Sequence, residues 1–446
     1  MSKKEDLYKM LEDGDLRRTS NMGIIPSGSE IPTVEKLEEN LRQSPYFKVK
    51  SFVEMEKDEE QPDMIGYTAE IEYKEGVFDV DFYLKSTDVI DFEIYGYGNR
   101  IDNQYIEAAS KQLAFWEVVM EFSSNSLESF HLQLKIMDVA VPDSLVVVDF
   151  LSIRFLSSKW LHMTAQSETP PSPDYLYVLH CVYNEKDNKR AYWIHTHGLH
   201  RCGSVELEMV GITSGLEQME SLFNSTIKKF LTDPSREMET FKIGYDGMDI
   251  NLCWERWENA LKRFPTNSLG GFEDRPEDDV HTEPSGVLFA VEDDNMTSPE
   301  IYISTLSDNP IYYISTEETM RMSALAKERF SVFRRIFEEK HSAPKNKSFI
   351  KKFFSKEEEE EPQWDFLVKM GLSVDANGID TEKEHLWFRV ISFKNEFIEA
   401  KLLNQPYWIS GLNEGDVNRY PVEFLTDWLI YSPERTYTTD TIYELI

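Results

Sequence analysis

Two adjacent blocks of like charge constrain this chain more than any other feature of its sequence. Both blocks lie within residues 341–362. The basic block consists of Lys345, Lys347, Lys351, Lys352 and Lys356, and the acidic block is the run of five glutamates at 357–361, which Pro362 follows. Blocks of like charge repel internally and do not pack into a core. We therefore interpret 341–362 as a charged linker that separates a C-terminal module, residues 363–446, from the rest of the chain.

The C-terminal module has a composition of its own, because it holds four of the nine tryptophans. The alternation of residues over 385–393 predicts a strand, and Lys394-Asn395 predicts a turn into a partner strand at 396–403. Further strands are expected at 420–424 and 427–431. Short strands closed by tight turns predict a small β-rich module that resembles a barrel.

The remainder of the chain is predicted to be α+β. A length of 446 residues suits two to four domains. We interpret residues 1–20 as a polar N-terminal tail that is either frayed or a short helix, 21–165 as an N-terminal α+β domain and 174–340 as a second α+β domain that ends in a long helix. Prolines at 170, 171 and 173 mark the boundary. The two mixed α/β sheet regions form either two domains or one continuous unit.

Periodicity and turn residues predict the individual elements. In the first region they are a strand at 22–26, a helix that begins at Thr33, a hairpin of strands 67–73 and 77–83, and amphipathic helices at 102–120 and 126–139. In the second region they are strands at 175–183, 191–195, 205–210, 286–292, 300–305 and 311–314, a helix at 215–231, a short helix opened by Trp254, and the long helix from Ser315.

Charge and cysteine content exclude several classes of protein. A net charge of −34 repels the phosphates of nucleic acids and anionic lipids, and it attracts basic partners. The three cysteines Cys181, Cys202 and Cys253 provide no disulfide framework, which indicates a reducing compartment. No apolar segment suggests a secretion signal or a membrane span. We therefore expect a cytoplasmic protein that binds no nucleic acid.

The sharpest local cluster of reactive side chains falls between Trp193 and Gly203. Its candidate metal ligands are His195, His197, His200 and Cys202. In a strand, His195 and His197 point to the same face, and neutral imidazoles and thiolates bind zinc. The alternative is structural, with Gly198 and Gly203 as turn glycines and the histidines hydrogen-bonded to backbone. We favour the structural interpretation, because His-x-His without further spaced ligands is a weak signal.

Two glutamates follow on the next predicted strand. Glu206 and Glu208 form either a carboxylate pair for acid–base chemistry or the polar face of a strand with Leu207 and Met209 inward. We favour the polar face. The sequence contains no Gly-rich phosphate loop, no G-x-S-x-G elbow and no H-E-x-x-H motif.

Two segments of the chain carry a family resemblance. The core His-Thr-His-Gly-Leu-x-Arg-Cys-Gly-x-x-Glu-Leu-Glu within 193–209, together with the helix 321–330, resembles uncharacterised bacterial proteins grouped as domain-of-unknown-function family 4026. The C-terminal motifs at 385–388, 404–409, 415–416 and 426–431 resemble family 2314. Neither resemblance implies an activity or catalytic residues. Small modules of this kind occur in proteins that bind other proteins, including toxin-immunity systems.

Two hypotheses follow. The first is a non-enzymatic interaction protein without a cofactor, whose acidic surface binds another protein of basic character. The second is a zinc-binding protein or metal-dependent hydrolase centred on His195, His197, His200 and Cys202. We favour the first hypothesis, because the charge of −34 and the linker suit it and no catalytic motif opposes it.

Overall fold

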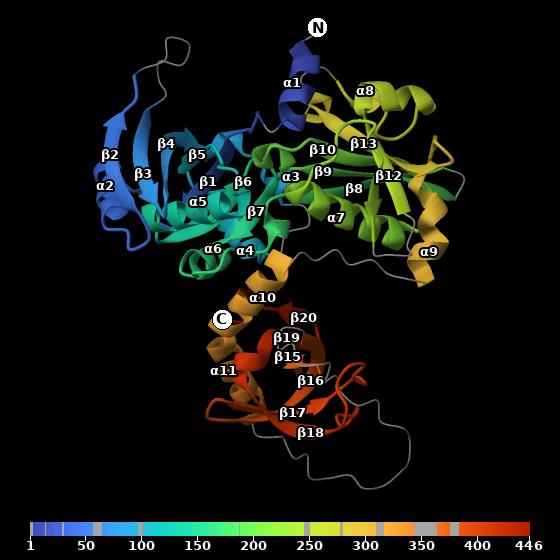
Figure 1. The fold of residues 1–446 in the computed structure, drawn as a ribbon. Helices are drawn as coiled ribbons and strands as arrows, with labels where there is room; N and C mark the ends of the chain where they lie inside the picture. Colours follow the sequence, from blue (N-terminus) through green and yellow to red (C-terminus); the bar gives the residue numbers. More distant parts are fainter. Residues whose placement is uncertain are drawn as a thin grey trace, which may run out of the picture. The chain divides into compact units, whose positions relative to one another are not determined.

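The computed structural model divides the chain into two compact units (Figure 1). Unit 1 comprises Met1–Gln166 and Pro171–Tyr313, and unit 2 comprises Ser167–Pro170 and Ile314–Ile446. The residues that the structure describes are 3–13, 15–28, 31–56, 65–96, 101–186, 188–244, 250–276, 280–308, 316–342, 364–374 and 383–446. Most of the predicted linker, and the predicted strand at 311–314, therefore lie outside the described residues.

The first sheet of unit 1 is antiparallel, with the strand order β2-β3-β4-β5-β1-β6-β7. Its strands are β1 (Ser20–Pro26), β2 (Lys48–Glu54), β3 (Gly66–Tyr73), β4 (Gly76–Ser86), β5 (Ala114–Met120), β6 (Ser144–Asp149) and β7 (Arg154–Ser157). The accompanying helices are α1 (Lys3–Glu12), α2 (Val34–Arg42), α3 (Phe92–Tyr95), α4 (Asn103–Ala109), α5 (Ser126–Ala140) and α6 (Ser158–Ala165). The predicted strand at 22–26, the 67–83 hairpin and the Thr33 cap are confirmed.

Two predictions in this region need correction. The predicted helix at 102–120 is α4 followed by β5, because the run Ala114–Met120 is rich in β-forming residues and pairs with β4 and β1. Helix α5 is buried on nearly every side rather than amphipathic, and its Gln133 amide donates to the Ser20 and Val118 carbonyls. Of the two alternatives for the N-terminal tail, the short helix is confirmed: it is α1, whose Tyr8 is buried and donates to the Ser285 carbonyl at 3.0 Å.

The second sheet of unit 1 has the order β11-β12-β13-β10-β9-β8, with β14 on β13. Only the β10–β13 pair is parallel among the described strand pairs. The strands are β8 (Val178–Lys186), β9 (Lys189–His197), β10 (Glu206–Ile212), β11 (Phe241–Ile243), β12 (Ile250–Arg256), β13 (Ser285–Glu292) and β14 (Asn295–Thr297). Figure 1 shows α7 (Leu216–Thr232) and α8 (Trp257–Ala260) on opposite faces of this sheet.

Two further predictions fail in this second region. Residues predicted as a strand at 300–305 form the 3-10 helix η7 (Pro299–Tyr302) and α9 (Ile303–Asp308), because Ser298 caps Glu300 and proline occupies the first position. Trp254 belongs to β12 instead of opening a helix, and it is fully buried with its indole donating to the Ser235 carbonyl.

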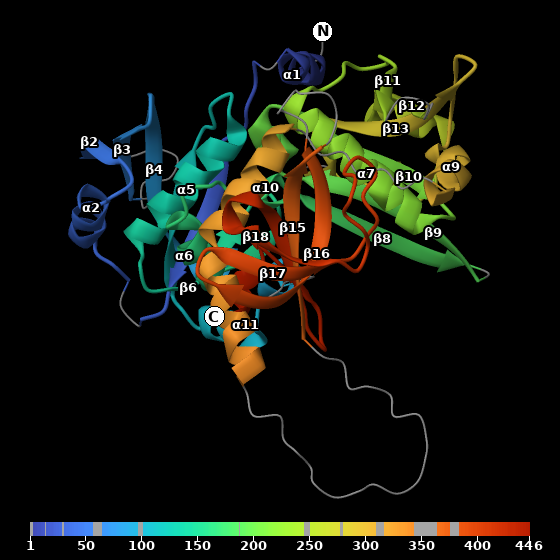
Figure 2. The ribbon, with the colours of Figure 1, turned by 60° about the horizontal axis from the view of Figure 1, so that its bottom comes forward.

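Unit 2 contains a six-stranded antiparallel sheet of order β18-β17-β16-β15-β19-β20. Figure 2 shows its strands β15, β16, β17 and β18. Its strands are β15 (Asp365–Ser373), β16 (Lys383–Lys394), β17 (Phe397–Leu402), β18 (Val417–Pro421), β19 (Leu425–Tyr431) and β20 (Thr436–Thr438), and its helices are α10 (Thr316–Glu328) and α11 (Phe330–Ser342). The module is β-rich as predicted, but its sheet is open and is not closed into a barrel. In a closed barrel the apolar side chains of the sheet would pack on one another, whereas here they pack on α10 and α11. Trp428 of β19 donates to the Ala326 carbonyl and packs on Phe333.

The long helix predicted from Ser315 is thus two helices that are grouped with the C-terminal sheet in unit 2. Among the described helices of both units, none has the length and apolar character needed to cross a membrane.

Candidate metal centre

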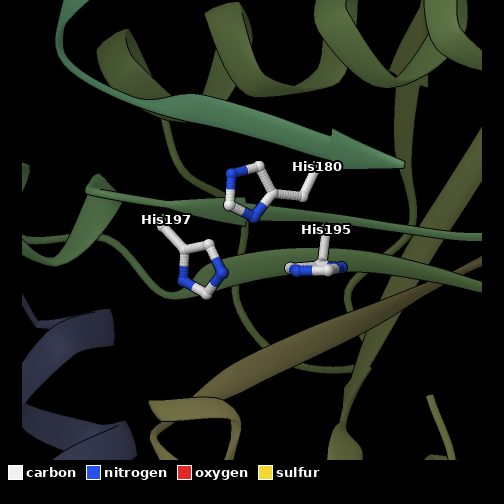
Figure 3. A group of neighbouring side chains, drawn as sticks. All are labelled: His180, His195 and His197. Carbon is white, nitrogen blue, oxygen red and sulfur yellow. The ribbon is translucent and has the colours of Figure 1, made fainter. Parts of the chain in front are cut away.

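The hairpin of β8 and β9 brings three imidazoles together. His180 lies directly opposite His195 in the antiparallel register, and His197 follows two residues later on the same face as His195. One possible ligand atom from each of the three lies within 4.8 Å of the others. Figure 3 shows a ring nitrogen of each histidine pointing toward the same space. We call His180, His195 and His197 the histidine centre.

Burial sets the protonation state of the histidine centre. His195 and His197 are 3% and 5% exposed, whereas His180 is partly exposed. Burial, reinforced by the neighbouring histidines, lowers the pKa of His195 and of His197 far below the ordinary value, and it also lowers the pKa of His180. The rings are therefore neutral at pH 7, which is the form that binds metal ions. The Nδ1 atom of His195 is buried and has no hydrogen-bond partner among the residues that the structure describes.

A fourth histidine approaches from the 3-10 helix η6 (Val280–Thr282). The Nε2 atom of His281 lies 3.3 Å from the Nε2 atom of His195. The His281 ring centroid is 4.9 Å from that of His195 and 5.2 Å from that of His197. The two centroids of His195 and His197 are themselves 5.0 Å apart. His281 is therefore part of the same group of rings.

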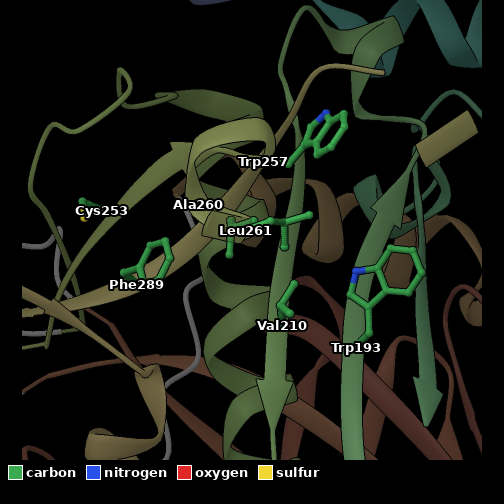
Figure 4. Packing of buried hydrophobic residues seen from close by; sticks show 8 residues of the cluster. Trp193, Val210, Cys253, Trp257, Ala260, Leu261 and Phe289 are labelled. Carbon is green, nitrogen blue, oxygen red and sulfur yellow. The ribbon is translucent and has the colours of Figure 1, made fainter. Parts of the chain in front are cut away.

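Glu208 orders the surroundings of the histidine centre. It lies opposite His195 on β10, accepts a 2.7 Å hydrogen bond from the Trp193 indole and pairs with the Arg275 guanidinium at 2.5 Å. The Trp193 ring in turn packs on His195, with 4.1 Å between centroids. Figure 4 shows Trp193 within a buried apolar cluster that includes Trp257 of α8.

The prediction of a water-facing polar strand at 206–208 is wrong. Glu206 and Glu208 are 9% and 2% exposed, because loops and α8 cover this face of the sheet. Glu206 accepts hydrogen bonds from the Thr196 hydroxyl at 2.6 Å and from the Gly198 N–H at 2.8 Å. Both glutamates are thus buried and hydrogen-bonded, as buried carboxylates must be.

The other two predicted ligands point elsewhere. The His200 Nε2 atom is 2.8 Å from the Pro284 carbonyl oxygen, and its Nδ1 atom is 3.4 Å from the Glu283 carboxylate. Burial alone would lower the pKa of His200, but the bond to Glu283 and the charge of Glu206 raise it. Burial raises the pKa of the Cys202 thiol to about 11. The structure therefore places His195 and His197 in one group, and it places His200 and Cys202 outside that group.

The turn between β9 and β10 confirms one part of the structural interpretation. Gly198 and Gly203 flank the 3-10 helix η3 (Leu199–Cys202) with φ values of 115° and 75°. That left-handed region favours glycine. The turn directs His200 and Cys202 away from the face that carries His195 and His197.

Sequence reasoning missed His180 and His281. A signal for His180 existed, because the predicted turn at 185–188 pairs Lys186 with Lys189, and the same register places residue 180 opposite residue 195. No comparable signal existed for His281, which lies in the 3-10 helix η6, 86 residues after His195.

Comparison with known families covers most of the chain. The N-terminal model of the family described as Protein of unknown function (DUF4026) matches residues 20–171, and its C-terminal model matches residues 179–289. Together they span more than half of the sequence. The chain belongs to the DUF4026 family. The model for Uncharacterized protein conserved in bacteria (DUF2314) matches residues 317–446, so both expected families are confirmed. The helix 321–330, which the motifs assigned to DUF4026, lies instead within the DUF2314 match.

The DUF4026 matches also locate the histidines. His180, His195, His197 and His281 all fall within the C-terminal DUF4026 segment, 179–289. The DUF2314 segment contains α10, α11 and the third sheet, which together make up nearly all of unit 2. Searches for similar curated proteins and for similar solved structures gave no match.

Proposed function

We propose that this DUF4026 chain is a metal-binding protein and that the histidine centre holds a divalent transition metal of the zinc class. The observation that carries the proposal is the convergence of His180, His195 and His197, with ligand atoms within 4.8 Å of one another. Three imidazoles on adjacent strands are a ligand set that zinc uses in proteins.

The chemistry of the rings supports the proposal that the histidine centre binds a cation. Neutral imidazoles that face one another in a buried place direct lone pairs at a common point, and a divalent cation stabilises that arrangement. Imidazole suits zinc, copper, nickel and iron, whereas magnesium and calcium prefer oxygen ligands. The nearby carboxylate of Glu208 is engaged by Arg275 and Trp193, which is typical of a group that orients ligands from outside the coordination shell.

Zinc binding by the full-length protein tests this proposal. We expect one equivalent of zinc after dialysis against a weak chelator, and a loss of at least tenfold in affinity in His180→Ala and in His195→Ala. His162→Ala is the matched control, because His162 is exposed and belongs to α6. Less than about one-tenth equivalent of any first-row metal in the wild-type protein would contradict the proposal, since such sites bind tightly.

A second candidate function, the binding of a basic protein partner, is supported by a loop of unit 2. Tyr407 and Trp408 are 87% and 68% exposed, and the Glu384 carboxylate accepts hydrogen bonds from both backbone N–H groups, at 2.7 and 2.9 Å. Aromatic side chains held on a fixed backbone are frequent anchors of protein interfaces. The net charge of −34 favours a basic partner.

Co-purification at low salt tests the second candidate. We expect a basic protein to copurify with the wild-type chain and to be lost with Tyr407→Ser/Trp408→Ser. The matched control is Val417→Ser, because Val417 is also exposed on unit 2 but lies on β18. Identical sets of copurifying proteins from the wild type and the double variant would contradict it.

A further inference from the structure

We infer that His281 is the fourth ligand of the same metal ion, so that metal binding fastens the segment around η6 to the β8–β9 hairpin. This inference rests on the proposed metal-binding function and deepens it. It assigns the ion a structural role with four protein ligands, instead of the open position that a hydrolytic zinc site keeps for water.

The spacing of two nitrogens is the first argument. In a tetrahedron the edge is about 1.6 times the distance from centre to corner, so nitrogens about 2.0–2.1 Å from zinc lie roughly 3.3 Å apart. The Nε2 atoms of His195 and His281 are 3.3 Å apart. In the metal-free protein one of these rings donates a hydrogen to the other, and a bound ion takes the place of the shared proton.

The distribution of the rings is the second argument. The His281 ring lies close to the rings of both His195 and His197, with distances between ring centroids of 4.9 and 5.2 Å. His180 approaches the same two rings from β8, at 5.5 and 5.0 Å. The ligand atoms of His180, His195 and His197 form the tighter group, so we expect the His281 ring to shift inward when the ion binds.

The backbone of η6 is held in place by the groups that order the histidine centre. The Arg275 guanidinium donates a 2.6 Å hydrogen bond to the His281 carbonyl oxygen and pairs with Glu208. Trp193 packs on both His195 and His281, with centroid distances of 4.1 and 4.7 Å. The His281 ring is therefore directed to the centre by contacts that do not depend on the metal.

The consequence concerns the long connection between α8 and β13. His281 lies in this connection, 86 residues after His195, and a shared ion would cross-link the two. An ion that binds only the folded arrangement stabilises it, and the stabilisation grows with the logarithm of the free ion concentration relative to the dissociation constant. Metal binding should thus reduce local opening of the η6 segment more than that of other segments.

X-ray absorption and hydrogen exchange on the full-length protein, loaded with one equivalent of zinc, test the inference. We expect four nitrogen ligands in the wild type and three nitrogens plus one oxygen in His281→Ala, with zinc affinity at least tenfold weaker. Zinc should also slow amide exchange at 280–284 in the wild type but not in His281→Ala.

His200→Ala is the matched control for the packing of this segment, because His200 contacts Pro284 and Glu283 without belonging to the histidine centre. It should keep four nitrogen ligands. If His281→Ala retains wild-type affinity, ligand number and exchange, the inference fails while the proposed function stands. If the wild-type protein binds no zinc, the proposed function fails and the inference fails with it.

Discussion

Arg201 and Asp149 form an ion pair from which solvent is completely excluded, with 2.6 Å between Nη2 and Oδ2. The remaining guanidinium nitrogens donate to the Leu176 carbonyl at 3.0 Å and to the Ser20 hydroxyl at 3.1 Å. Burial would raise the pKa of Asp149, but the charges of Arg201 and Arg154 lower it. Within unit 1 Arg201, in the Arg-Cys-Gly turn, therefore connects η3 to strands β1 and β6 of the first sheet.

Removing the arginine leaves the buried Asp149 carboxylate without its partner. We expect Arg201→Met to lower the free energy of unfolding of unit 1 by about 3–5 kcal/mol, which is typical of breaking a buried pair. Urea denaturation followed by circular dichroism measures the loss. The double variant Arg201→Met/Asp149→Leu should recover part of it, and a single variant as stable as the wild type would contradict the account.

Asp427 of β19 provides a prediction about pH in unit 2. Burial raises its pKa to about 6, aided by Asp440 and opposed by the Trp428 N–H, Lys369 and Arg321. Because the folded pKa lies above the unfolded one, the contribution to stability is fully present below about pH 4 and is lost as pH rises through 6. Thermal melts should show the wild type losing stability relative to Asp427→Asn between pH 4.5 and 7.5. A difference that stays constant over this range would refute it.

At the scale of elements, local chemistry decided which predictions succeeded. The hairpins of β3–β4, β8–β9 and β16–β17 combine alternation with turn residues, and all three exist. The segment 299–308 is helical because a serine cap and a proline outweigh its β-forming residues. The buried polar face of β10 depends on covering segments remote in sequence, which no local pattern reveals.

The loop that carries Tyr407 and Trp408 is held in part by the Glu384 side chain, beside hydrogen bonds that Gln405 makes within the loop. Replacing Glu384 with alanine removes the acceptor of both backbone N–H groups. We expect the amides of Tyr407 and Trp408 to exchange with solvent at least tenfold faster in Glu384→Ala, with little change in the melting temperature, because both side chains are exposed. Glu414→Ala, on the same loop, is the control. Unchanged exchange would show that other contacts hold the loop.

At the scale of the whole molecule, the sequence predicted the α+β class. It placed the start of a C-terminal module at 363, after the charge block and at a change in composition, whereas unit 2 comprises Ser167–Pro170 and Ile314–Ile446. The sequence did not predict that α10 and α11 belong to unit 2, because their apolar residues are suited to packing on any sheet. It also located two of the four clustered histidines. His195 and His197 are separated by a single residue in the sequence, whereas locating His180 requires the strand register and locating His281 requires the tertiary fold.

Metal removal should affect the two units differently. Free zinc at 100 times its dissociation constant stabilises the unit that binds it by about 2.7 kcal/mol. We therefore expect a chelator to lower the unfolding transition of unit 1, which contains the four histidines, and to leave that of unit 2 in place. Calorimetry of the full-length protein, with His162→Ala as a control, resolves the two transitions. Equal shifts in both would count against the site in unit 1.

The most direct test of the metal centre is a crystal structure of the zinc-loaded protein with anomalous diffraction recorded at the zinc edge. The account predicts one strong peak among the ring nitrogens of His180, His195 and His197, with His281 as the fourth ligand. No peak at that position, in crystals grown with excess zinc, would contradict the central claim.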